Sequence, residues 1–175
     1  MIHHFADRLI DKIETTGSFG CLGIDPRPDW SRFANQDRVE TTFELILSEL
    51  AGKGGLPAIK PQAAFLGDSI ERMRRLCSVG KRDGVLSIAD VKRGDIGTTA
   101  EAYAEEWLKT PFDAITVNPY LGIDSLEPFV KVAASEGRGI FVLVRTSNKG
   151  AADIQELEVK GGMRVYEHVA LMFDA

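Results

Sequence analysis

Apolar residues along the chain follow two alternating patterns. In the longer segments they recur three and four positions apart, whereas the short runs between these segments are apolar almost throughout. The first spacing places apolar side chains on one face of a helix, and the second is typical of parallel strands that are buried on both faces. The pattern predicts helices over residues 2–16, 36–51, 64–80, 98–109, 124–136 and 162–173. It predicts strands over residues 19–25, 58–62, 85–92, 114–120 and 139–147. Thr98 and Glu101 have the spacing of a capping box and predict the start of the fourth helix.

Polar residues gather at the ends of the predicted strands. They are Asp25, Lys60, Asp90 with Lys92, Asn118, and Thr146 with Ser147. In a (β/α)₈ barrel the carboxyl ends of all strands meet at one mouth, whereas a doubly wound sheet uses mainly one switch point. The turn after the first predicted strand, "GIDPRPDW", also lacks the glycine spacing of a dinucleotide-binding unit. We therefore predict an α/β protein with the TIM (β/α)₈ barrel fold, of which about the first five βα units are present.

The length of the chain falls short of a complete barrel. It has 175 residues, whereas eight βα units typically need about 250. An open arc of five strands would have bare edges, and no repeat, linker or low-complexity tract predicts a second domain. We expect residues 1–175 to be a single domain that forms the N-terminal portion of a longer barrel, or a truncated product of one.

Composition and charge exclude several classes of function. The formal net charge is -5 and basic residues do not cluster on any predicted element, which argues against nucleic-acid binding. No apolar run approaches the roughly 18 residues of a membrane span, and the acidic N-terminus does not have the pattern of a signal peptide. Cys21 and Cys77 are predicted to be reduced packing residues, which favours a cytoplasmic protein.

The third predicted strand ends in the charged pattern D-x-K-x-x-D, formed by Asp90, Lys92 and Asp95. Taken by itself, such a pattern more often marks a solvated loop between a strand and a helix. Here it follows a fully apolar strand, and Lys60 and Asp25 occupy equivalent strand ends. An ammonium held between carboxylates suits a reaction in which negative charge builds on carbon, because it can neutralise a carbanion and then deliver a proton to it.

Five separated motifs resemble the orotidine 5'-phosphate decarboxylase family, in its longer bacterial subfamily. They are "CLGIDPRP", "IKPQAAF", "ADVKRGDIGTTAEAYA", "ITVNPYLGIDSLEPF" and "FVLVRTSNKGAADIQ", and they occur in the family's order. The resemblance extends from Phe5 to about Gln155. Departures are Val91, where alanine is common, and "RTSNKG", where the subfamily is closer to K-T-S-N-P-G. The family's later phosphate-binding segment and glutamine-bearing loop have no counterpart in these 175 residues.

The resemblance implies a role for eight residues. Lys92 matches the proton donor, Asp90 the carboxylate beside the substrate's own carboxylate, and Lys60 the second lysine, which also reaches the ribose. Asp95 matches an aspartate that enters the partner's site across a dimer interface, accompanied by Ile96 and Thr99. Asp25 matches a residue that binds a ribose hydroxyl, and Ser147 one that reads the pyrimidine edge.

The implied activity is decarboxylation of orotidine 5'-phosphate to UMP in pyrimidine biosynthesis, without cofactor or metal, by a homodimer with composite sites. Two alternatives stay open. Related barrels with the same charged pattern act on sugar phosphates and hold Mg²⁺ through their carboxylates, and a shared fold does not fix function. The chain could also be a non-catalytic fragment, and we expect residues 1–175 by themselves to be inactive.

Overall fold

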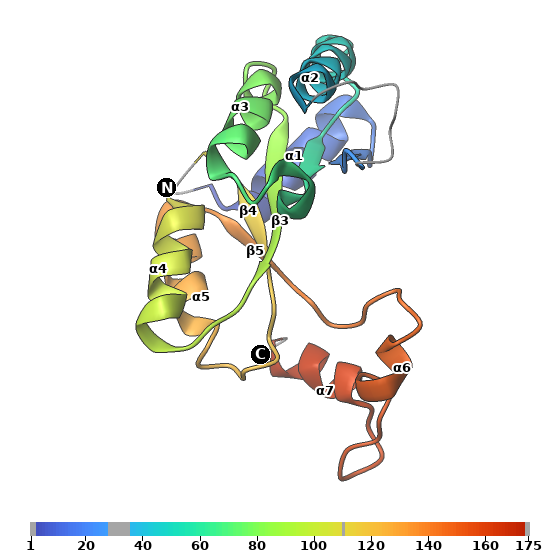
Figure 1. The fold of residues 1–175 in the computed structure, drawn as a ribbon, viewed down its shortest axis with the longest axis vertical. Helices are drawn as coiled ribbons and strands as arrows, with labels where there is room; N and C mark the ends of the chain where they lie inside the picture. The colour runs from blue at the N-terminus through green and yellow to red at the C-terminus, as the bar shows by residue number, and fades with distance from the viewer. Residues whose placement is uncertain (1–2, 28–35, 110, 174–175) are drawn as a thin grey trace.

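Five parallel strands form one sheet whose spatial order is the order of the sequence, β1-β2-β3-β4-β5. The computed structural model describes residues 3–27, 36–109 and 111–173. The strands are β1 (Cys21–Ile24), β2 (Ala58–Pro61), β3 (Leu86–Arg93), β4 (Ala114–Val117) and β5 (Gly139–Val142). A doubly wound sheet would reverse its strand order at a switch point, whereas a barrel adds each strand beside the previous one. The chain is therefore a partial α/β barrel, as the strand ends predicted (Figure 1).

Helices alternate with the strands: α2 to α5 cover one face of the sheet, α1 lies across the amino ends of the strands, and α6 and α7 lie on the segment after β5 (Figure 1). They are α1 (Phe5–Thr16), α2 (Gln36–Gly52), η1 (Ala63–Leu66), α3 (Ile70–Lys81), α4 (Gly97–Leu108), α5 (Glu127–Glu136), α6 (Ala151–Ile154) and α7 (Val165–Met172). The core between these helices and the sheet includes Leu47, Met73, Leu76, Trp107, Leu108, Ile115 and Phe129, all of which are almost fully buried. No helix in the described part of the chain combines the length and the apolar character needed to cross a membrane.

Three local predictions are corrected by the structure. The helix predicted over 64–80 is interrupted at Gly67, whose φ of 67° ends η1, and α3 then begins with the hydroxyl of Ser69 accepting a hydrogen bond from the Arg72 N–H. The helix α4 begins at Gly97 after Ile96, so Thr98 is not its cap. The short helix α6 was not predicted. Cys77 is buried as expected, but Cys21 is exposed, because it lies on the open inner side of the strand arc.

Alternate residues of the strands face the barrel interior and the surrounding helices. On the interior side, one apolar cluster contains Phe5, Ala58, Leu86, Ile88 and Ala114. Their neighbours Ile59, Ala89 and Ile115 belong to the core under the helices. The interior cluster lies at the amino ends of the strands, where Phe5 brings α1 across them. The same alternation then places Lys60, Asp90 and Thr116 on the interior side at the carboxyl ends.

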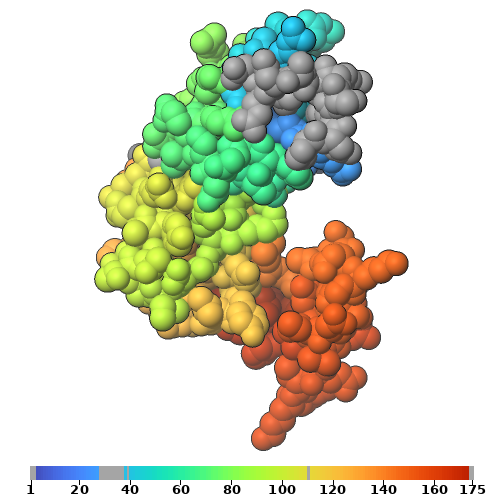
Figure 2. Space-filling model, in the orientation of Figure 1, coloured from blue at the N-terminus to red at the C-terminus, as the bar shows by residue number. Residues whose placement is uncertain are grey.

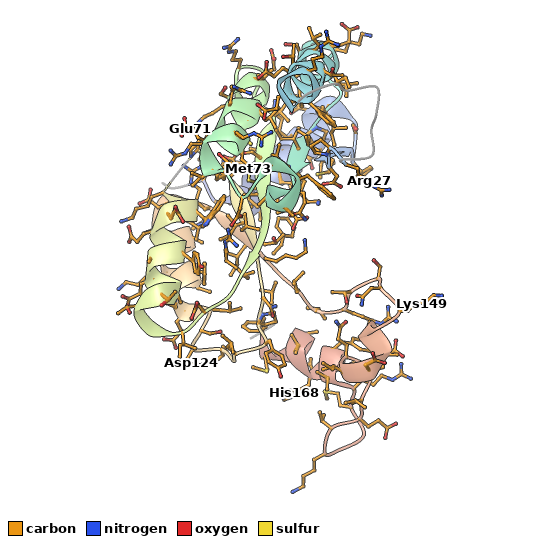
Figure 3. All side chains as sticks on the ribbon, viewed as in Figure 1. Arg27, Glu71, Met73, Asp124, Lys149 and His168 are labelled. Carbon is orange, nitrogen blue, oxygen red and sulfur yellow. The ribbon has the colours of Figure 1, made fainter. Side chains whose placement is uncertain are left out.

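The segment after β5 projects away from the rest of the chain beyond the carboxyl ends of the strands (Figure 2). Lys149 and His168 lie on this projection (Figure 3). Its internal contacts include an ion pair between Arg145 and Glu156 at 2.5 Å. The helix α7 has no buried residue among those described. The projection is therefore held by its own polar contacts, by β5, which joins it to the sheet, and by Phe173 at the end of α7, which packs against the main core.

Candidate active site

A chain of alternating charges crosses the carboxyl ends of β2 and β3. Lys60 Nζ lies 2.6 Å from Asp90 Oδ2, and Lys92 Nζ lies 2.5 Å from Asp90 Oδ1. The side chain of Asp90 is 8% exposed, whereas those of Lys60 and Lys92 are 34% and 44% exposed. Each oxygen of one buried carboxylate thus holds one ammonium group, and both ammonium groups remain accessible from the barrel mouth. The structure brings together three of the four residues expected to be catalytic.

The lysines determine the charge of Asp90. Burial by itself would raise the pKa of the Asp90 carboxyl, but hydrogen bonds and attraction from Lys60 and Lys92 outweigh it and hold this pKa below its ordinary value. Asp90 is therefore ionised at neutral pH. A permanent negative charge at this point fixes both ammonium groups in the mouth, where they face any bound molecule.

Replacing Lys92 with methionine is expected to make the protein more sensitive to acid. A carboxyl whose pKa is lower in the folded than in the unfolded protein stabilises the fold above its unfolded pKa, and this contribution is lost as the pH falls through its folded pKa. Without Lys92 the folded pKa of Asp90 rises, so the loss begins at a higher pH. Acid unfolding of the full-length protein, followed by circular dichroism, should show a midpoint shifted to higher pH.

The matched control for this experiment is Lys53→Met. Lys53 also forms a close ion pair, at 2.6 Å from Glu49, but both side chains are about two-thirds exposed on α2. An exposed pair of this kind contributes little to stability, so the acid midpoint should stay where it is. Equal midpoints in the parent and the Lys92→Met variant would show that Lys92 does not set the pKa of Asp90.

Thr116 on β4 is a further residue of this network that the sequence did not reveal. Its hydroxyl donates to Asp90 Oδ1 at 3.1 Å and accepts hydrogen bonds from the backbone N–H groups of Val91 and Lys92. The available signal was a hydroxyl residue inside the apolar run of β4, two positions after the interior residue Ala114. Such a residue on an interior face needs polar partners, and those partners are the candidate catalytic residues.

Asp25 follows β1 at the same end of the sheet and is half-buried. Its Oδ1 atom is buried and has no hydrogen-bond partner among the described residues. A buried carboxylate oxygen without a donor is costly, because it has lost water and gained nothing in return. Asp25 therefore has hydrogen-bond acceptor capacity that no described residue uses.

The remaining predicted residues lie outside the charged network. Asp95 is half-buried, and its Oδ1 accepts a hydrogen bond from the following N–H, that of Ile96, at 2.8 Å. Ile96 is 61% exposed and Thr99 is exposed. The structure therefore does not join Asp95, Ile96 or Thr99 to the site of their own chain.

Ser147 is exposed on the segment that projects after β5. The residue before it is held firmly, because the Gln155 amide accepts from the Thr146 N–H and donates to the Thr146 hydroxyl, both at 2.8 Å. These contacts fix the backbone that carries Ser147 but do not bring it into contact with the charged network. No cluster of three or more histidine, cysteine or acidic side chains gathers within the described ranges in a way that could hold a metal ion.

Comparisons with known proteins agree with this geometry. Residues 21–172 match the model of the orotidine 5'-phosphate decarboxylase / HUMPS family. An orotidine 5'-phosphate decarboxylase of Rhodopirellula baltica is 40% identical over 95% of this chain and 62% of its own length. One from Clostridium perfringens is 38% identical over 94% of this chain and 61% of its own length. The chain thus spans about three-fifths of the length of these curated relatives.

Solved structures give the same result. A crystal structure from Streptomyces avermitilis assigned to the same enzyme superposes with a TM-score of 0.85 at 31% identity, covering 97% of this chain and 62% of the other. The OMP decarboxylase of Leishmania donovani superposes with a TM-score of 0.74 at 34% identity, covering 95% of this chain and 63% of the other. With the barrel topology and the paired lysines, these matches show that the chain belongs to the orotidine 5'-phosphate decarboxylase / HUMPS family.

Proposed function

We propose that the full-length protein decarboxylates orotidine 5'-phosphate to UMP in pyrimidine biosynthesis, without a cofactor or a metal. The observation that carries this proposal is the Lys60–Asp90–Lys92 network at the mouth of a barrel of this family. Both oxygens of Asp90 are engaged by ammonium groups. Binding a divalent cation at Asp90 would therefore require displacing them, whereas a developing negative charge in the mouth would be met by them directly.

In the proposed reaction the bond between C6 of the pyrimidine and its carboxylate breaks. Carbon dioxide leaves, and the electron pair of the broken bond stays on C6. The ammonium of Lys92 stabilises this carbanion and transfers a proton to it, which gives UMP, and the amine then regains a proton from water. Asp90 holds the Lys92 ammonium at 2.5 Å and carries a charge of the same sign as the departing carboxylate.

The other residues bind and orient the substrate in this proposal. The Oδ1 of Asp25, which has no partner among the described residues, accepts a hydrogen bond from a ribose hydroxyl. Lys60 donates to the ribose while it holds Asp90. Ser147 reads the pyrimidine edge from the segment after β5. We propose that residues 1–175 form the N-terminal portion of a single barrel domain and that the phosphate is bound by its other strands. This is supported by the open strand arc and by the three-fifths of the relatives' length that the chain matches.

The test of the proposed function is turnover of orotidine 5'-phosphate by the purified full-length protein. We expect conversion to UMP at the same rate with and without a metal chelator. Loss of activity in the chelator that Mg²⁺ restores would instead favour a metal-dependent sugar-phosphate enzyme, the other activity considered for this barrel. Absence of any turnover by a folded full-length protein would contradict the proposal.

We also propose that the protein is a homodimer in which Asp95 completes the partner's site. Supporting this, four large apolar side chains are exposed in the loops after β3 and β4: Ile96, Tyr120, Leu121 and Ile123. Gly97, at the start of α4, and Asp124 line one groove, so the two loops are neighbours at this end of the molecule (Figure 3). Exposed large apolar side chains in two neighbouring loops are a feature of many protein interfaces.

We propose a cytoplasmic location as well, because the charged substrate would not cross a membrane unaided.

Mixing two inactive variants is expected to restore activity if Asp95 acts across the interface. In a dimer of Lys92→Ala with Asp95→Asn, one site has both defects and the other has neither. Random exchange of subunits should therefore give about a quarter of the parent activity, because half of the dimers are mixed and each has one intact site of two. Turnover after subunit exchange measures this.

The matched control mixes Lys92→Ala with Lys60→Ala. Both lysines belong to the same chain's network, so each site in a mixed dimer keeps one defect and activity should not return. Failure of the first mixture to regain activity, with exchange verified by mass spectrometry, would place Asp95 in the site of its own chain or outside the site altogether.

A further inference from the structure

The pairing between β3 and β4 is interrupted where β3 carries its charged residues. Ile88 and Ala89 pair with Ala114 and Ile115, and pairing resumes between Arg93 and Val117. Residues 90–92 of β3 therefore lie opposite a single residue of β4, Thr116. Bulges of this kind bend a strand and redirect its side chains, and they are frequent next to active sites.

Lys92 has an unusual backbone conformation within this bulge. Its φ is 47°, in the left-handed region that a residue with a Cβ atom rarely adopts. Such a conformation persists where the surrounding structure enforces it. In a regular strand Lys92 would share the interior face with Asp90, but its side chain would leave the backbone in another direction. The exact position of the ammonium group therefore depends on what holds the backbone here.

The hydroxyl of Thr116 replaces the missing ladder hydrogen bonds. It accepts from the N–H of Val91 at 3.0 Å and from the N–H of Lys92 at 2.9 Å, and it donates to Asp90 Oδ1 at 3.1 Å. A hydroxyl has one proton to donate and two lone pairs, so every hydrogen-bonding capacity of this group is used. Thr116 is also buried, with 9% of its surface exposed, so water is poorly placed to substitute for it.

We propose that Thr116 is a positioning residue for the reaction, which holds the left-handed backbone of Lys92 and the carboxylate of Asp90 in a fixed relation. This inference rests on the proposed function. The same oxygen holds the backbone that carries the ammonium and the carboxylate that binds it, so the two cannot move independently. Thr116 does not touch the reacting carbon; it acts through Lys92 and Asp90.

The test compares Thr116→Val with Thr116→Ser in the full-length protein. Valine keeps the shape of threonine but leaves two N–H groups and one carboxylate lone pair without their partner, whereas serine keeps the hydroxyl. For Thr116→Val we expect kcat to fall by about 10- to 100-fold, since a misplacement near 1 Å costs roughly this much, with KM close to the parent value. Thr116→Ser should recover most of the lost kcat.

Ser87→Ala is the matched control. Ser87 is a buried hydroxyl residue at the opposite end of β3, where its Oγ donates to Asp113 Oδ2 at 3.1 Å. Loss of this hydroxyl should lower stability and leave kcat unchanged. If Thr116→Val lowers stability but keeps the parent kcat, or if Thr116→Ser is as impaired as Thr116→Val, the positioning role is wrong.

A measurement that does not need turnover separates this inference from the proposed function. In Thr116→Val the amide protons of Val91 and Lys92 should exchange with solvent about tenfold faster than in the parent, whereas in Thr116→Ser they should stay protected. Unchanged exchange in Thr116→Val would overturn the inference even in an active enzyme. The predicted change in exchange, in a protein that does not turn over orotidine 5'-phosphate, would support the role of Thr116 in holding the Lys92 backbone and contradict the activity. Should the valine variant not fold, Thr116→Cys, with its weak donor and acceptor, carries the same comparison.

Discussion

Replacing Lys92 with alanine is expected to lower the turnover of orotidine 5'-phosphate by a factor of about 10⁴ or more, because the variant loses both the proton donor and the charge that stabilises the carbanion. The fold should survive. Lys92 is 44% exposed, and Asp90 keeps its contacts with Lys60 and the Thr116 hydroxyl. Steady-state turnover by the full-length variant, together with its circular dichroism spectrum, measures the two effects separately.

Two further variants identify what Lys92 contributes. Lys92→Arg keeps a positive charge, but a guanidinium does not give up a proton in proteins, so this variant should remain severely impaired while still binding the substrate. Lys109→Ala is the surface control, since Lys109 pairs with Glu105 on an exposed face of α4 and should have no effect on turnover. A Lys92→Ala enzyme that keeps most of its rate would remove Lys92 from the role of proton donor.

The barrel topology could be predicted because the signal for it is repeated along the chain. Each strand is an apolar run with its polar residues at its carboxyl end. Five separate segments thus give the same prediction, that polar side chains meet at the mouth of a barrel. The pairing of Lys60, Asp90 and Lys92 could be expected for the same reason, since residues two apart on a strand share a face. The strand order and the described ion pairs agree with both expectations.

The sequence marks Thr116 only as a hydroxyl residue in an apolar strand, and its positioning role could not be predicted, because that role depends on the bulge in β3. In a regular register, backbone carbonyl groups of the neighbouring strands would accept hydrogen bonds from the N–H groups of Val91 and Lys92. The Thr116 hydroxyl would then not be needed as their acceptor. The extra residues in β3 are a property of how two strands pair, and a single strand's pattern of apolar residues does not contain that information. The left-handed conformation of Lys92 was hidden for the same reason, since nothing about its residue type favours a positive φ.

The start of the fourth helix was predicted to within one residue, but its cap was wrong. The spacing of Thr98 and Glu101 predicted a capping box, yet α4 begins at Gly97 with no side-chain cap, directly after the loop that leaves β3.

The role of Asp113, at the opposite end of the sheet, could not be predicted from the residues next to it in the sequence. Asp113 precedes β4, and its side chain contacts residues from distant segments. Its importance comes from which segments the barrel brings together.

Asp113 connects several segments at the amino ends of the strands. Its Oδ1 lies 2.5 Å from Arg8 on α1 and 3.4 Å from Arg138 before β5, and its Oδ2 accepts hydrogen bonds from the N–H and hydroxyl of Ser87 on β3. The side chain is only 10% exposed. The carboxylate of Asp113, which precedes β4, thus contacts α1, β3 and the residue before β5. These contacts lie at the end of the barrel opposite the mouth.

Replacing Asp113 with alanine is expected to lower the free energy of unfolding by about 3 kcal/mol, because a buried N–H loses its acceptor and two arginines lose their partner. The arginines are partly exposed, which keeps the loss below that of a fully buried pair. Urea unfolding of the full-length protein measures it. Glu105→Ala, which breaks an exposed pair with Lys109, should cost less than about 1 kcal/mol. Because Asp113 lies far from the mouth, kcat should be retained at temperatures where the variant is folded. A variant as stable as the parent would show that α1 is held by its apolar contacts through Phe5 and not by this carboxylate.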